Sequence, residues 1–304
     1  MTAPPPLPTG WRIWLLGARV RTLPAAVVPV IVGTSAGLRA GHVGDIDAVN
    51  AVLAMLVALA LQVATNFAND YSDGKRGVDD PSERIGPPRL VGNGLASAPA
   101  VKVAMLISFG VALVAGSGLV LRVGWELVPV GVAAVAAGWF YTGGPRPYGY
   151  AGLGEVFVFT FFGLVATVGA AYVQEGRVTW LSVGCGVAVG FLATALLVVN
   201  NLRDIPGDER AGKRTLAVVL GDRRTRFLYV GLVVGAFVLV PPIAGLSGRP
   251  FAALALPAVI LASAPVTKVL GGASGRALFP VLAATARVEL IFGVLLAVGL
   301  SIAV

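Results

Sequence analysis

The sequence predicts an all-α, polytopic membrane protein that forms one domain over residues 1–304. Two observations predict this class. First, 57% of the residues are hydrophobic and 12% are charged, with a mean hydropathy of +0.86, which a water-soluble domain of this size would not tolerate on its surface. Second, several apolar stretches of about twenty residues match helices that cross a hydrocarbon core of about 30 Å. Because these stretches do not alternate in polarity as barrel strands do, the spans are helices.

Residues 11–22 precede the first predicted span and combine Trp and Leu side chains with Arg12, Arg19 and Arg21. This composition is typical of a helix that lies in the membrane interface. Nine transmembrane helices follow, with the predicted ranges 24–40, 48–69, 101–121, 127–142, 152–173, 182–203, 226–246, 252–270 and 281–303. Nine is an odd number, so we expect the two ends of the chain to lie on opposite sides of the membrane.

The distribution of Lys and Arg predicts which side is which. With the N-terminus placed inside, 18 of the 23 Lys and Arg residues fall in inner loops and four fall in outer loops. This positive-inside bias predicts that the N-terminus and two Asp-rich loops are cytoplasmic, with the C-terminus on the opposite side of the cell membrane. The net charge of +8 therefore reflects topology, and we expect contact with the lipid bilayer and none with nucleic acid.

The first acidic motif, residues 66–80, follows the second predicted span. At about 100° per helical residue, Asn66, Asp70 and Asp73 fall within roughly 60° of one another, so one helical face would present two carboxylates and an amide. Hard divalent cations prefer oxygen ligands of this kind. The spacing therefore predicts a metal site at the membrane boundary.

A second copy of the motif, residues 200–214, follows the sixth span, and Asn200, Asp204 and Asp208 are again four residues apart. The separation from Asn66 to Asn200 and that from Asp70 to Asp204 are both 134 residues. This equality predicts an internal repeat of about four helices whose two copies face each other. Both motifs fall on the cytoplasmic side of the predicted topology.

The two motifs together predict a diphosphate site. The expected set comprises four carboxylates, four amides and four cations: Asp70, Asp73, Asp204 and Asp208; Asn66, Asn69, Asn200 and Asn201; Lys75, Arg76, Lys213 and Arg214. Four carboxylates alone would repel one another, whereas two Mg²⁺ ions would remove the repulsion and bind substrate phosphate. The Lys and Arg side chains would neutralise the diphosphate. A charged head beside an apolar interior fits an isoprenyl diphosphate, whose allylic cation the interior would protect from water.

These residues carry a resemblance to a known family. Five motifs carry this resemblance: Asn69-Asp70-Tyr71-x-Asp73-x-x-x-Gly77-x-Asp79, Arg84-x-Gly86-Pro87, Tyr141-Thr-Gly-Gly-Pro-x-Pro-Tyr148, Asn200-x-x-x-Asp204-x-x-x-Asp208 and Gly212-Lys213-Arg214-Thr215. Over essentially the whole chain the sequence resembles the UbiA-type intramembrane prenyltransferases, and within them the 1,4-dihydroxy-2-naphthoate polyprenyltransferase branch. The family often spaces its first motif Asp-x-x-x-Asp, but position 74 is Gly here and Asp73 takes that place.

The resemblance implies nine helices around a central cavity that is open to lipid, and transfer of a polyprenyl chain to 1,4-dihydroxy-2-naphthoate with loss of carbon dioxide. This reaction gives demethylmenaquinone, in menaquinone biosynthesis. The implied magnesium ligands are Asn66, Asp70, Asp73, Asn200, Asp204 and Asp208, and Asp70, Asp73, Asp204, Asp208 and Lys213 are the implied catalytic residues. The expected substrate-binding residues are Asn66, Asn69, Lys75, Arg76, Tyr141, Arg146, Tyr148, Asn200, Asn201, Arg203 and Arg214.

Alternative functions remain open from the sequence. A related enzyme acting on 4-hydroxybenzoate or homogentisate would share the metal motifs, and a secondary transporter would share the repeat and the buried polar groups. The single Cys185 and the single His42 exclude an internal disulfide, a zinc cluster and a His-dependent triad. Three charged residues inside spans, Glu155, Arg287 and Glu289, could orient the aromatic acceptor or form structural ion pairs.

Overall fold

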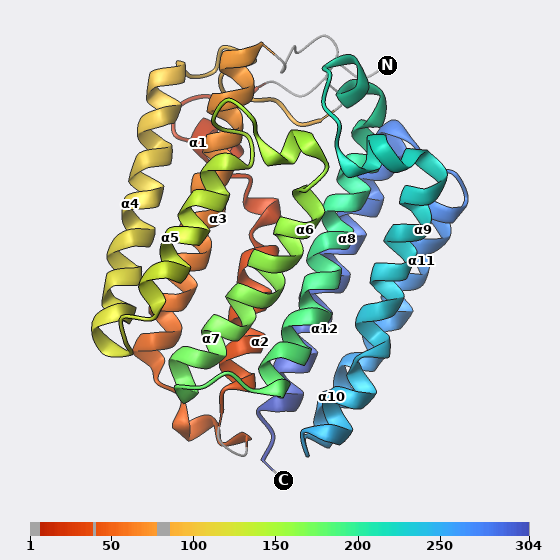
Figure 1. The fold of residues 1–304 in the computed structure, drawn as a ribbon. Coiled ribbons are helices and arrows are strands. Elements are labelled where there is room, and N and C mark those ends of the chain that lie inside the picture. The colour runs from red at the N-terminus through yellow and green to blue at the C-terminus, as the bar shows by residue number, and fades with distance from the viewer. Residues whose placement is uncertain (1–6, 39–40, 78–85, 304) are drawn as a thin grey trace.

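The computed structural model describes residues 7–38, 41–77 and 86–303, and within these ranges every regular element is helical. The helices run side by side as one elongated bundle (Figure 1). The described chain begins at one end of the bundle and finishes at the other, as the odd number of predicted spans requires (Figure 1). The all-α membrane class that the composition predicts is therefore confirmed.

The chain enters the bundle through a bent pair of helices. Helix α1, Arg12–Ala18, is followed by a 3-10 turn, Val20–Thr22, and then by α2, Pro24–Ala36. The two parts meet at 52°. The bend follows Arg19, whose φ of 51° lies in the left-handed region that stops an α-helix. The predicted amphipathic segment 11–22 is thus helical, but it forms a separate short element before the first span.

Two 3-10 turns lie at Val43–Asp45 and Tyr148–Ala151, and several consecutive elements join into one helical stretch, such as Gly154–Glu175 and Leu216–Leu246. The other elements follow in chain order. They are α3 Ala48–Arg76, α4 Ala98–Arg122, α5 Leu127–Phe140, α6 Gly154–Val158, a π-helical segment Phe159–Val165, α7 Ala166–Glu175, α8 Trp180–Arg210, α9 Leu216–Val238, α10 Val240–Leu246, a 3-10 segment Pro250–Ala258, α11 Val259–Leu270, a 3-10 turn Gly275–Leu278, and α12 Phe279–Leu300. Seven helical stretches are long and apolar enough to cross a membrane, or eight with the bent pair, while α5 is shorter. Nine spans stay a prediction for the described chain.

The carboxylates Asp70, Asp73, Asp204 and Asp208 lie on helices, which corrects the prediction of two Asp-rich loops. Helix α3 continues to Arg76, past Asp70 and Asp73, and α8 continues to Arg210, past Asp204 and Asp208. Helix α3 ends only at Gly77, whose φ of 71° suits a glycine at the position after a helix. The basic residues in the last turns favour continuation because they face the negative end of the helix dipole. The carboxylates are therefore held on rigid elements.

Helix α8 runs through the centre of the bundle, and two thirds of its most apolar window is buried. It packs against α9 and α12 on one side and against the π-helical segment on the other. The π-helical contact is very close: a Cβ added to Gly163 would lie 2.4 Å from the Cα of Gly190. Only glycine leaves room for two helices to come this close. The contact therefore holds the π-helical segment against α8, ten residues before the second acidic motif begins.

Candidate active site

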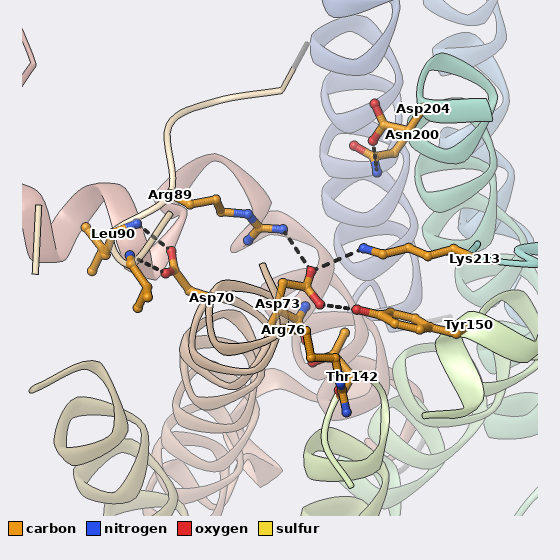
Figure 2. A network of polar contacts seen from close by, with 12 residues as sticks. Asp70, Asp73, Arg76, Arg89, Leu90, Thr142, Tyr150, Asn200, Asp204 and Lys213 are labelled. Carbon is orange, nitrogen blue, oxygen red and sulfur yellow. Dashed lines mark hydrogen bonds and ion pairs between the residues drawn. The ribbon is translucent and has the colours of Figure 1, made fainter. Parts of the chain in front are cut away.

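Asp73 is the centre of the candidate site. Its side chain is buried near the end of α3, and three elements contact it (Figure 2). The Lys213 ammonium lies 3.4 Å from Oδ2, an Arg89 guanidinium nitrogen lies 3.9 Å from the same oxygen, and the Tyr150 hydroxyl donates a hydrogen bond to Oδ1. Lys213 follows α8 and is 140 residues away in sequence. The two predicted acidic motifs therefore meet at one end of the bundle.

The neighbouring Asn69 and Arg76 hold the segment between α5 and α6. The Thr142 hydroxyl donates a 2.7 Å hydrogen bond to Oδ1 of Asn69. The Arg76 guanidinium donates to the backbone carbonyls of Thr142 and Gly144. These bonds tie residues 141–153 to the end of α3. Asn69 and Arg76 thus bind this segment, and the substrate contact that the sequence predicted for them stays a prediction.

Asp70 and Asp73, which the sequence predicted on one helical face, contact different parts of the chain. Its two carboxylate oxygens accept hydrogen bonds from the backbone N–H groups of Leu90 at 2.8 Å and Val91 at 2.9 Å. Figure 2 shows the carboxylate directed to this loop and away from the Lys213 contact. About 60° of helical rotation separates the two residues, which is enough for each to meet a different element. Asp70 therefore holds the loop that carries Arg89.

Asn66 is likewise directed to another element. Its amide nitrogen donates to the carbonyl of Ala18 at 2.9 Å and to the hydroxyl of Thr22 at 3.2 Å. The amide thus fastens α3 to the bend between α1 and α2. Among the described residues, Asn66, Asp70 and Asp73 thus have different contacts, and that of Asp73 includes Lys213 of the second motif.

In the second motif, Arg203 binds the side chains of Asn200 and Asp204. Its guanidinium donates to Asp204 at 2.7 and 2.5 Å and to Oδ1 of Asn200 at 2.9 Å. The same guanidinium lies 5.0 Å from the centre of the Phe279 ring. Arg203 is 4% exposed and neutralises Asp204 from within the protein, and its predicted contact with substrate stays a prediction. Asp208 contacts the Thr215 hydroxyl at 3.4 Å.

The tyrosines of residues 141–153 form an aromatic group beside these charges. Tyr148 stacks on Phe157 with ring centres 3.8 Å apart and meets Tyr141 edge-on at 5.5 Å. The Lys213 ammonium lies 4.6 Å from the centre of the Tyr150 ring. Burial raises the pKa of Tyr150, and the charge and hydrogen bond of Asp73 raise the pKa further. Tyr150 therefore keeps its proton and remains a donor to Asp73.

Comparison with known proteins decides the family. The sequence profile described as the UbiA prenyltransferase family matches residues 26–279. The chain belongs to the UbiA prenyltransferase family. It is 46% identical to the 1,4-dihydroxy-2-naphthoate octaprenyltransferase of Mycobacterium tuberculosis, over 95% of this chain and 96% of that protein. It is 38% identical to the Escherichia coli protein of the same name, over 75% and 74% of the two chains.

Solved UbiA structures share the fold. A UbiA homolog from Archaeoglobus fulgidus bound to DMAPP and Mg²⁺ matches with a TM-score of 0.63, at 17% identity, over 94% of this chain and 99% of that one. A UbiA homolog from Aeropyrum pernix K1 matches with a TM-score of 0.66, at 16% identity, over 90% and 96%. At this level of identity the likeness concerns the fold, which confirms the helical architecture that the sequence predicts.

The UbiA site suits a divalent cation by the chemistry of its donors. Asp73, Asp204 and Asp208 supply carboxylate oxygens, and Asn200 supplies an amide oxygen. Lys213 and Arg203 neutralise two of these carboxylates, so the site already balances negative with positive charge. Among residues 7–38, 41–77 and 86–303, no three His, Cys, Asp or Glu side chains form a ready metal cluster. Asp79 and Arg84 of the quoted motifs lie outside the described residues.

Other predicted residues lie at the edge of the UbiA site. Lys75 is exposed over the Tyr71 ring, with 5.8 Å from the ammonium to the ring centre, and Arg146 is exposed. Arg214 is exposed, but its backbone N–H donates to the carbonyl of Tyr150 at 3.0 Å. Sequence reasoning missed Arg89 and Tyr150 as site residues. Tyr150 belongs to the same Gly- and Pro-rich turn as Tyr141 and Tyr148, and that turn was the available signal.

Proposed function

We propose that this UbiA-family protein transfers a polyprenyl chain from its diphosphate to 1,4-dihydroxy-2-naphthoate in a Mg²⁺-dependent reaction. The acceptor loses its carboxylate as carbon dioxide and keeps both ring hydroxyls, so the direct product is demethylmenaquinol, the reduced form of demethylmenaquinone. One structural observation supports the diphosphate half: Lys213, which follows α8, meets Asp73 of α3 at 3.4 Å. The 46% identity over 95% of the chain to a relative named for this acceptor supports the other half.

The proposed magnesium ligands are Asp73, Asn200, Asp204 and Asp208, with two ions expected. Bound Mg²⁺ would neutralise charge on the departing diphosphate. Asp70 is left out of this set because both of its oxygens hold the loop backbone. The proposal therefore uses one carboxylate from α3 and two from α8.

The protein's own cations bind the diphosphate in this proposal. Lys213 leaves its contact with Asp73 and reaches a diphosphate oxygen, and Arg89 on the adjoining loop contributes a second positive charge. Arg203 stays with Asn200 and Asp204, because it is buried and makes three short hydrogen bonds there. Tyr150 donates to Asp73 and so directs the second carboxylate oxygen into the site.

In this proposal, the aromatic side chains and the apolar interior of the bundle bind the prenyl chain and the ring of the acceptor. As the bond from the prenyl C1 to the diphosphate oxygen breaks, its electron pair leaves with the diphosphate and positive charge develops on the allylic carbons. The ring faces of Tyr141, Tyr148 and Phe157 can stabilise this charge. The hydrophobic interior excludes water, which would otherwise capture the cation. The ring carbon of the acceptor then forms the new bond, and loss of carbon dioxide restores the aromatic ring.

Incubation of purified protein with Mg²⁺, radiolabelled polyprenyl diphosphate and a panel of aromatic acids tests the proposal. The panel contains 1,4-dihydroxy-2-naphthoate, 4-hydroxybenzoate and homogentisate. We expect label to enter the naphthoate product, and we expect Asp73→Asn and Asp204→Asn to remove the activity. Asp222→Asn is the matched control, since Asp222 pairs with Arg226 on α9 outside the site. Prenylation of 4-hydroxybenzoate alone would overturn the acceptor assignment, and turnover in excess EDTA would overturn the metal requirement.

A further inference from the structure

Glu155 is a buried carboxyl group that the diphosphate chemistry does not use. It lies in the first turn of α6 and is 5% exposed. The amide nitrogen of Asn201, on α8, donates a 2.9 Å hydrogen bond to Oε1. The other oxygen, Oε2, is buried and has no hydrogen-bond partner among the residues that the structure describes. A buried polar atom without a partner costs free energy, so its retention needs an explanation.

The carboxyl group adjoins the candidate active site. Asn201 follows Asn200 of the second acidic motif, and the Tyr141 ring lies next to the start of α6. A Cβ added to Gly154 would lie 3.6 Å from the Tyr141 hydroxyl oxygen. Because Gly154 directly precedes Glu155, Tyr141 lies beside the turn of α6 that carries this carboxyl group.

Two contacts hold the helical stretch of Glu155 against α8. The π-helical segment begins four residues after Glu155 and packs on α8 through the Gly163 and Gly190 contact. Segments of π-helix occur frequently at functional sites. Asn201 holds Oε1 from the α8 side. The hydrogen bond from Asn201 orients the carboxyl group, and Oε2 remains as a hydrogen-bond acceptor near the Tyr141 ring.

The chemistry of this place suits a hydroxyl group on an aromatic ring. Oε2 can accept one hydrogen bond, and Tyr141 and Tyr148 provide aromatic surface close by. We propose that Glu155 binds a ring hydroxyl of the aromatic acceptor through Oε2, with Asn201 as the positioning residue that orients the carboxyl group. A hydrogen bond from the hydroxyl to the carboxyl oxygen increases electron density on the ring carbon that attacks the prenyl group. This inference rests on the proposed function, which supplies an acceptor with two ring hydroxyls.

The test measures the acceptor and the prenyl diphosphate separately. Glu155→Gln keeps the size of the side chain and the contact with Asn201, but can present a donor amide in place of Oε2. We expect kcat/KM for 1,4-dihydroxy-2-naphthoate to fall roughly 10- to 100-fold, the range for a hydrogen bond to a charged group. The KM for the prenyl diphosphate should remain unchanged. Glu175→Gln is the control, because Glu175 ends α7 and pairs with exposed Arg177.

Acceptor analogues identify the hydroxyl. The two naphthoates that lack one hydroxyl, 1-hydroxy-2-naphthoate and 4-hydroxy-2-naphthoate, are compared in the wild type and in Glu155→Gln. The variant should lose its penalty with the analogue that lacks the hydroxyl held by Glu155 and keep it with the other. An equal penalty on every acceptor, or a raised KM for the prenyl diphosphate, refutes the assignment.

Two further measurements distinguish failure of the Glu155 proposal from a folding defect of the variant and from a wrong choice of acceptor. Thermal unfolding in detergent and binding of prenyl diphosphate show whether the variant is folded. If Glu155→Gln does not purify, Glu155→Asp keeps the charge but withdraws the carboxyl group by one methylene, and must show the same dependence on one hydroxyl. If the wild type prenylates no naphthoate, the proposed function fails. The Glu155 assignment is then decided by the same kinetic comparison on the phenolic acid that the wild type does prenylate.

Discussion

Asp70 and Asp73 are three residues apart on α3, yet the structure gives them different tasks, and substitution should separate these tasks. Asp70→Asn keeps one oxygen for the loop but places an amide group against the other backbone N–H. Hydrogen bonds from a backbone N–H to a charged group are worth about 1.5–3 kcal/mol each, so we expect the free energy of unfolding to fall by about that amount. The midpoint of thermal unfolding in detergent should fall on the order of 5 °C.

Asp73→Asn should have the opposite profile. Its carboxylate meets Lys213, Arg89 and Tyr150, so its loss should affect stability less and ligand binding more. Loss of even an outer partner of a metal ligand typically costs 10- to 100-fold in affinity, so we expect Mg²⁺-dependent binding of prenyl diphosphate to weaken by more than about 100-fold. Asp70→Asn should retain the wild-type dependence on Mg²⁺ concentration.

Calorimetric titration of prenyl diphosphate at several Mg²⁺ concentrations, with thermal unfolding of the same samples, measures both quantities. Asp222→Asn serves as the control for loss of a carboxylate that pairs with Arg226 at the surface. If Asp70→Asn unfolds like the wild type and no longer binds prenyl diphosphate with Mg²⁺, then Asp70 is a metal ligand and the reasoning from its backbone contacts is wrong.

Three further outcomes follow from particular contacts. Tyr150→Phe removes the hydrogen bond to Asp73 but keeps the ring beside Lys213, so kcat/KM should fall about tenfold, and Tyr150→Leu should lower it further; equal activity of the Phe variant and the wild type would contradict the role. Lys213→Met should raise the KM for prenyl diphosphate about 10- to 100-fold with a smaller change in the KM for the acceptor, as measured by varying each substrate in turn. The pKa of Asp47 is lowered from 3.8, chiefly by the backbone N–H of Asn50 and then by Arg122. The stability that Asp47 contributes is present above its ordinary pKa and is lost as pH falls through the lowered value, so thermal unfolding of Asp47→Asn should depend less on pH as the pH falls below 3.8.

The positions of the helices and their acidic ends could be predicted from the sequence. Hydropathy fixes where a helix must cross lipid, and the excess of Lys and Arg on one side predicts that the ends of α3 and α8 lie together. Helix α3 runs further than predicted because hydropathy marks only the apolar part of a helix. Polar residues such as Asp70 and Asp73 continue it until Gly77 provides a left-handed end.

The partners of the individual carboxylates could not be predicted in the same way. Rotation about the helix axis places Asp70 and Asp73 within about 60° of each other. Asp70 nevertheless binds the backbone N–H of Leu90, whereas Asp73 pairs with Lys213. Arg203 was predicted to contact substrate because it is a cation in the motif, whereas its burial and its bonds to Asn200 and Asp204 come from the packing of α8. The spacing of residues along one helix does not determine which distant segment of the chain packs against each of them.

The charge balance of the site explains how one surface can be stable both with and without substrate. Asp73 pairs with Lys213, and Asp204 pairs with Arg203, so neither carboxylate is left as an isolated charge in a poorly hydrated place. The Lys213 side chain is flexible and makes a long 3.4 Å contact, whereas Arg203 is held by short bonds. In the proposed function, a diphosphate that arrives with divalent ions would exchange partners with Lys213 while Arg203 stays in place. The longer ion pair would then be the one that opens, with the Lys213 ammonium on Asp73 before binding and on the diphosphate afterwards.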